Sequence, residues 1–157
     1  MSGTAVGWRQ MRWVTRSSPK TDRIACPWLI LRFIDLEAQI VHVPPDQVLP
    51  YATKHGGHSF DAPGAQFTHR EGECTFEVLV EEFRIEDAAV RRIAAIVHGA
   101  DIDGEIGATP QSAGLLAIAE GFRDMEADNR RSLELQLPLY DALYQWAHQQ
   151  PEGSGRT

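Results

Sequence analysis

A histidine and an aspartate stand three positions apart in the segment His98-Gly-Ala-Asp101. Residues three apart on a helix project from one face, so these two side chains can hold one ion or one water molecule together. Imidazole with carboxylate suits zinc, iron, nickel or manganese. A structural interpretation competes with this one, because a histidine near a helix C-terminus interacts favourably with the helix dipole and the aspartate can serve the following turn. Taken alone, the pair favours the structural interpretation.

A second polar segment runs from His69 to Glu77 and carries a histidine, a thiol and several carboxylates. We expect this segment to form an irregular loop that leads into a helix, and loops held by a scaffold often supply ligands. His69 is the preferred ligand here, because Cys74 can be a small buried hydrophobe and Glu77 can complement a helix dipole. The hypothesis of a metal site therefore uses these four side chains: His69, His98 and Asp101, with Glu77 as a further ligand.

A third segment gathers cations just ahead of an expected helix. Arg16, Lys20 and Arg23 fall within eight residues. Backbone N–H groups point outward at a helix N-terminus, so these side chains predict a cradle for a small oxyanion. A thiol in that positive field shifts toward thiolate, which makes Cys26 the candidate reacting group. The alternative is that Arg23 pairs with Asp22 while Cys26 packs inward.

The elements expected to position these residues give an α+β fold, in which a small sheet is covered by helices and the C-terminal half is helix-dominated. Short β-branched and aromatic runs predict the strands. They lie at residues 13–15, 40–43, 59–61 and 67–69. Apolar periodicity and capping residues predict the helices. These span residues 26–34, 47–54, 76–83 after a Thr75 cap, 88–98, 110–119 after a Thr109 cap, and 124–149.

Length and composition set the class of protein. The 157 residues, 43% of them hydrophobic, fit one domain with a packed core. We place that domain at residues 12–150, between disordered ends at 1–11 and 151–157. Two cysteines, with no export signal and no apolar run of about 20 residues, predict a cytoplasmic protein that does not insert into a membrane. The net charge of −7 argues against direct nucleic-acid binding.

The same segments are similar to those of the chromate-resistance protein B family, specifically its C-terminal domain, also called a chromate resistance exported protein. The most specific string is Asp22-Arg23-Ile24-Ala25-Cys26-Pro27-Trp28. Further similar stretches lie at residues 13–16, 60–64, 69–76, 98–101 and 140–144. The resemblance implies a bacterial stress response to chromate, described as sensing or regulation. Some family members carry an additional N-terminal domain.

These observations lead to one main hypothesis and two alternatives. The main hypothesis is a chromate-response protein, acting as sensor or metal-dependent enzyme, with a divalent transition metal beside an oxyanion-binding loop. The first alternative is a metal-free sensor or protein-interaction module of a chromate-resistance system. The second is a thiol-dependent reductase that uses Cys26 and Cys74, for which no nicotinamide or flavin fingerprint is present. Whether the chain is catalytic, and whether it forms homo-oligomers, stays open at this point.

Overall fold

The structure is a computed structural model that describes residues 11–17, 22–126 and 128–151, with the backbone alone at positions 22 and 23. Three strands come early in the chain: β1 (Arg12–Arg16), β2 (Gln39–Val43) and β3 (His58–Ser59). The helices are α2 (Asp22–Leu29), α3 (Val48–His55), α4 (Thr75–Glu82), α5 (Ala88–Asp101), α6 (Ser112–Met125) and α7 (Asn129–Gln149). This small sheet with its many helices confirms the α+β prediction.

The strands form one parallel sheet with β1 in the middle, in the order β2-β1-β3. The expected strands at 13–15 and 40–43 are confirmed, each slightly longer than predicted. The prediction of a fourth strand at 67–69 was wrong, because Phe67 makes only a single bridge to Phe60. Since all three strands run the same way, their carboxyl ends meet at one edge of the sheet, which is where α/β proteins commonly bind ligands.

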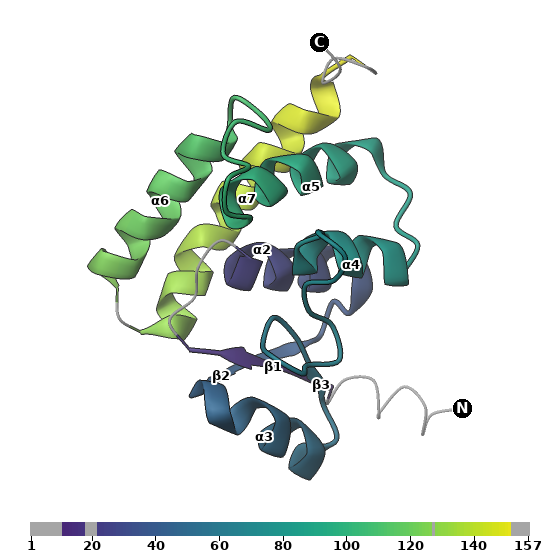
Figure 1. Ribbon diagram of the computed structural model, residues 1–157, viewed down its shortest axis with the longest axis vertical. Coiled ribbons are helices and arrows are strands. Elements are labelled where there is room, and N and C mark those ends of the chain that lie inside the picture. Colours follow the sequence, from purple (N-terminus) through teal and green to yellow (C-terminus); the bar gives the residue numbers. More distant parts are fainter. Residues whose placement is uncertain (1–10, 18–21, 127, 152–157) are drawn as a thin grey trace.

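Helices cover both faces of the sheet (Figure 1). Alternate residues of a strand face opposite sides. Trp13 accordingly joins the main core with Trp28 of α2 and Phe76 of α4, whereas Val14 packs with Val48 of α3 in a smaller core. The two tryptophan side chains are almost completely buried. The sheet is therefore held between α3 on one side and the larger helical layer on the other.

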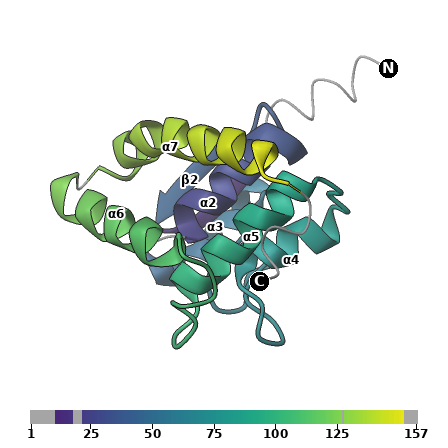
Figure 2. The ribbon, with the colours of Figure 1, turned by 90° about the horizontal axis from the view of Figure 1, so that it is seen from above.

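The larger layer is organised around α2, which lies between α7 on one side and α4 and α5 on the other (Figure 2). Helix α5 in turn packs against α6 and α7. Gly99 lets α5 approach the start of α6 closely, because a Cβ there would lie 2.3 Å from Ser112 Oγ. That buried hydroxyl donates a hydrogen bond to the carbonyl oxygen of Ile96 over 2.9 Å. The C-terminal end of α5, which carries His98 and Asp101, is thus held in a fixed position.

The start of α2 differs from the sequence prediction, which placed it near Cys26. Helix α2 begins at Asp22 and contains Pro27 at its sixth position. Proline lacks an N–H, so only one helical bond, to the carbonyl four residues earlier, is lost near the beginning of the helix. Beyond Leu29 the backbone continues as a π-turn at Ile30–Ile34, in which the Asp35 N–H donates to the carbonyl of Ile30 over 2.7 Å.

The starts of α4 and α6 also lie beside the residues expected from the sequence. Cys74, rather than Thr75, is the N-cap of α4, because the Thr75 hydroxyl donates to Asp61 instead. Thr109 does accept a hydrogen bond from the Ser112 N–H, but Pro110 lies in the preceding turn and α6 begins at Ser112. Helix α6 continues through Gly121 to Met125, and α7 starts only at Asn129.

No helix in the described part of the chain is long and apolar enough to cross a membrane. The predicted disordered ends lie mostly outside the described residues. Two residues at their borders are described: the Met11 carbonyl accepts a hydrogen bond from the Gln39 N–H, and the Pro151 carbonyl accepts one from Arg92. The ordered body therefore extends at least to both of these positions.

Candidate functional site at the carboxyl ends of the strands

Asp61 is the centre of a polar network just beyond the end of β3. Its side chain is almost completely buried, and its backbone has a positive φ of 50°. Aspartate tolerates this left-handed conformation better than most residues. One carboxylate oxygen accepts a hydrogen bond from the buried Thr75 hydroxyl over 3.0 Å. The network thereby connects the end of the sheet to the first residue of α4.

His69 connects the same carboxylate to the end of α5. Its Nε2 lies 3.1 Å from Asp101 Oδ2 and 3.5 Å from Asp61 Oδ1. The Asp61 side chain is buried and that of Asp101 is largely buried, whereas 43% of the His69 side chain is exposed. The imidazole therefore lies on the solvent side of two acidic groups that fix its position.

Arg16, the last residue of β1, reaches the network from the central strand. Its Nε donates to the backbone carbonyl of Asp61 over 2.8 Å, and the guanidinium lies 3.8 Å from the Asp61 carboxylate. The first contact is a hydrogen bond and the second is a longer charge contact. With 32% of its side chain exposed, Arg16 still presents positive charge to solvent.

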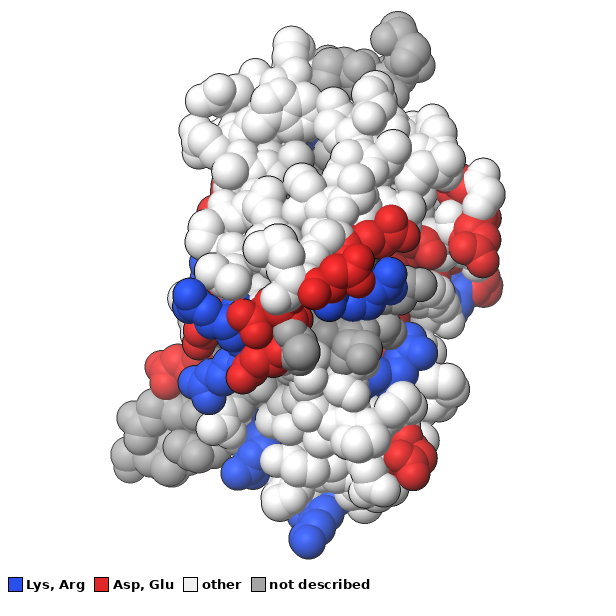
Figure 3. All heavy atoms as spheres, turned by 90° about the vertical axis from the view of Figure 1, so that its left-hand side faces the viewer, with Lys and Arg blue, Asp and Glu red and all other residues white. Residues whose placement is uncertain are grey.

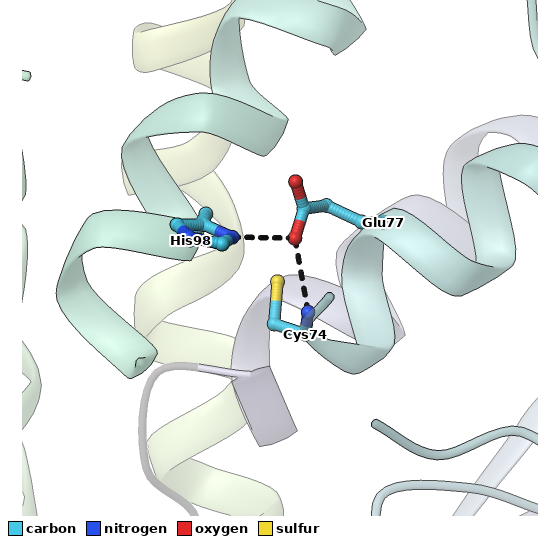
Figure 4. A group of neighbouring side chains, drawn as sticks. All are labelled: Cys74, Glu77 and His98. Carbon is cyan, nitrogen blue, oxygen red and sulfur yellow. Dashed lines mark hydrogen bonds and ion pairs between the residues drawn. The ribbon is translucent and has the colours of Figure 1, made fainter. Parts of the chain in front are cut away.

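A second cluster lies beside the first, where the start of α4 faces the end of α5. His98 Nδ1 is 2.7 Å from Glu77 Oε1, which also accepts a hydrogen bond from the Cys74 N–H over 2.9 Å (Figure 4). The second ring nitrogen, His98 Nε2, is 3.3 Å from Glu105 Oε1. The hydrogen bond to Glu77 raises the pKa of His98 above its ordinary value, against the opposing effect of partial burial.

The four sequence-predicted metal ligands thus come to one region of the molecule, but they form two pairs. Asp101 contacts His69, and Glu77 contacts His98. The two pairs lie in neighbouring clusters that share two chain segments. Cys74 of one cluster directly precedes Thr75 of the other, and Asp101 follows His98 by one helical turn. Convergence of His98 and Asp101 on one shared ligand stays a prediction.

The cationic loop is described only in part. Arg16 is placed as above, whereas Lys20 and the side chain of Arg23 lie outside the described residues. Cys26 is completely buried within the main core. A role for Cys26 as a reacting thiol stays a prediction, and this burial favours the alternative that it packs inward.

Sequence reasoning missed Asp61 and Glu105 as residues of these clusters, and it preferred His69 to Cys74 as a ligand. Asp61 did carry a signal, since it ends an expected strand directly before the turn Ala62-Pro63-Gly64, and an aspartate beside a turn commonly hydrogen-bonds to nearby groups. Cys74 had the spacing of a capping box with Glu77, three residues later. Nothing local distinguished Glu105, because its contact with His98 depends on the turn after α5.

Comparison with known proteins gives the family of the chain. Residues 13–147 match the family described as ChrB, C-terminal domain. A curated relative, Protein ChrB of Cupriavidus metallidurans, is 33% identical over 141 residues, which cover 85% of this chain and 40% of that protein. The chain therefore spans well under half of the length of that relative. No solved structure matches this chain. The match over nearly all of the described body shows that the chain belongs to the ChrB C-terminal domain family.

Proposed function

We propose that this chain is the oxyanion-responsive module of a chromate-resistance system, with a transition-metal site next to its anion site. Chromate and its isostere sulfate are small tetrahedral dianions, which proteins bind with arginine side chains and with helix N-termini. The family relationship and the chemistry of the site both support this proposal.

One observation carries the anion part: Arg16 and His69 lie on the solvent side of the Asp61 network. The carboxylates of Asp61 and Asp101 hold the Arg16 guanidinium and the His69 imidazole in place, so an incoming anion meets these two side chains before the acidic groups. The backbone of α2 begins at Asp22, a few residues beyond the end of β1. Lys20 and Arg23, on this connection and the first turn of α2, add to the cradle in the proposal.

The metal part rests on the neighbouring histidines and carboxylates. His69 with Asp101, and His98 with Glu77, are both pairs of a type that binds zinc, iron, nickel or manganese. A metal beside the anion site would add positive charge and would leave a position that an oxyanion or water can take. Analysis of the products distinguishes an enzyme from a sensor at such a site, since only an enzyme chemically changes the bound anion.

Calorimetric titration with sodium sulfate and sodium chromate tests the anion part. We expect Arg16→Gln to weaken binding of both anions about tenfold or more, because a charge-assisted hydrogen bond contributes about 1.5–3 kcal/mol. Arg130→Gln is the matched control, since this arginine is exposed on α7. Equal affinities in Arg16→Gln and the unchanged protein would reject the proposed anion site.

A second candidate function, protein interaction, is favoured by the surface of α6 and α7. An apolar pocket of ≈ 270 Å³ lies there, lined by Leu115, Ile118, Leu139 and Leu143 among others. Figure 3 shows that the upper part of this face carries almost no charged side chains, while a belt of acidic and basic residues crosses below it. An apolar pocket within a surface of few charges is typical of contact sites between proteins.

A further inference from the structure

We propose that Cys74, Glu77 and His98 bind one divalent transition-metal ion, with Glu105 as the positioning residue that orients His98. This inference deepens the metal part of the proposed function. It assigns ligands by geometry, adds a thiolate that the sequence hypothesis left out, and leaves His69 and Asp101 to the anion site.

The three donor atoms already lie together. Cys74 Sγ, a Glu77 carboxylate oxygen and a His98 ring nitrogen are all within 4.8 Å of one another. Figure 4 shows the sulfur pointing toward the space between the carboxylate and the ring. Ligands about 2.1 Å from a tetrahedral zinc ion are about 3.4 Å apart. The His98 to Glu77 separation of 2.7 Å therefore has to open only slightly.

Each ligand is placed by a different structural feature. Cys74 is the N-cap of α4, and Glu77 lies in the first turn of that helix. His98 belongs to the last turn of α5, whose position is fixed by the close contact of Gly99 with Ser112. Because two packed helices supply all three ligands, the site needs little rearrangement to bind an ion, and the part-exposed Glu77 and His98 leave it open to solvent.

Glu105 provides independent support. It lies 3.3 Å from Nε2 of His98, the nitrogen that faces away from Glu77. Metal-binding histidines characteristically donate the N–H of their second nitrogen to a carboxylate, which fixes the tautomer and makes the ligating nitrogen more basic. With the ion bound and the Nδ1 proton displaced, Nε2–H would donate to Glu105 and the Nδ1 lone pair would be directed at the ion.

The donor set indicates the class of metal. One sulfur, one imidazole nitrogen and one carboxylate oxygen suit zinc and neighbouring transition metals, whereas magnesium and calcium prefer oxygen alone. On binding, the Cys74 thiol proton passes to solvent, as does any proton on His98 Nδ1, and neither the metal nor the protein changes oxidation state. Three protein ligands leave a fourth position for water or an exogenous anion.

Cobalt(II) is the probe, because a thiolate bound to it gives a ligand-to-metal charge-transfer band in the near ultraviolet. We expect the full chain to show this band and Cys74→Ser to lose it. Cys26→Ala is the matched control and should keep it, since Cys26 is not part of the cluster. Glu105→Gln should keep the band but weaken metal affinity about 10- to 100-fold, in the range found for such carboxylate partners.

Sulfate titration of the same variants separates this inference from the proposed anion site. A charge-transfer band that survives in Cys74→Ser, or no band at micromolar cobalt in the folded protein, would overturn the metal site even if sulfate still binds. Circular dichroism checks that each variant is folded, and His98→Gln provides a second ligand substitution if Cys74→Ser does not fold. If Arg16→Gln loses sulfate binding but keeps the cobalt band, the result supports an anion site and a metal site that are separate.

Discussion

Asp101 Oδ2 lies 3.1 Å from His69 Nε2, although the two residues are 32 positions apart in the chain. The contact joins the last residue of α5 to the loop between β3 and α4. Since Asp61 contacts the same imidazole nitrogen, the position of His69 depends on the sheet and on the helical layer together. A ligand that moves His69 outward would therefore also alter its contact with Asp101 at the end of α5. His98 lies one helical turn from Asp101.

Asp61→Ala should destabilise the protein clearly. Alanine leaves the buried Thr75 hydroxyl without this partner, at a cost of about 1–3 kcal/mol. It also has to adopt the positive φ of this position, which adds about 1–3 kcal/mol of strain. Urea unfolding followed by tryptophan fluorescence measures the sum. Asp61→Asn, which tolerates the backbone conformation, should lose less, and an equal loss in both variants would show that the backbone strain is unimportant.

Gly99→Ala should disturb the contact between α5 and α6. The new Cβ would lie 2.3 Å from Ser112 Oγ, so the helices must move apart, and overpacking of this kind costs about 1–3 kcal/mol. Gly121→Ala in α6 is the matched control, because a Cβ there meets nothing within 4 Å. The control should gain up to about 1 kcal/mol from helix propensity. Thermal melting of both variants gives the comparison, and a Gly99→Ala variant as stable as the control would contradict the described packing.

The ion pair of Arg32 with Asp141 should make stability depend on acid pH. Hydrogen bonding to Arg32 lowers the pKa of Asp141 below its ordinary value, against partial burial, and Trp28 donates to the same carboxylate. A lowered folded-state pKa means that the stabilisation is complete above the unfolded-state value and is lost as the pH falls through the folded-state value. The melting temperature of Asp141→Asn should therefore fall less steeply than that of the unchanged protein between about pH 5 and pH 2. Parallel curves would show that Asp141 contributes nothing to this dependence.

The sequence predicted the elements of this fold better than their ends. The β-branched and aromatic run around Trp13 reflects burial of the central strand on both faces, and the apolar periodicity of α5 reflects burial of one face of that helix. Helix starts were harder, because a capping residue can use its side chain elsewhere. Thr75 donates to Asp61 across the fold, and this leaves the cap to Cys74. Contacts between distant segments determine this choice, and a local pattern does not contain them.

The candidate site was predictable in its residue types but not in its pairing. The motif His98-Gly-Ala-Asp101 suggested one shared ligand, since the spacing places both side chains on one helix face. In the fold the two side chains meet different partners, Glu77 and His69, which come from opposite ends of the segment 69–77. The course of that loop, which depends on the turn at Asp61, decides which groups meet.

The central claim, that a tetrahedral oxyanion binds at the carboxyl ends of the strands, is tested most directly by a nuclear magnetic resonance titration with sulfate. Sulfate has the shape and charge of chromate but does not oxidise the thiols. We predict that the largest saturable changes in backbone amide shifts occur at Arg16, at the first turn of α2 and at His69. Arg16→Gln should reduce these changes at equal sulfate concentration. Changes centred on the exposed arginines of α7, or no saturable change at any of the three predicted positions, would contradict the claim.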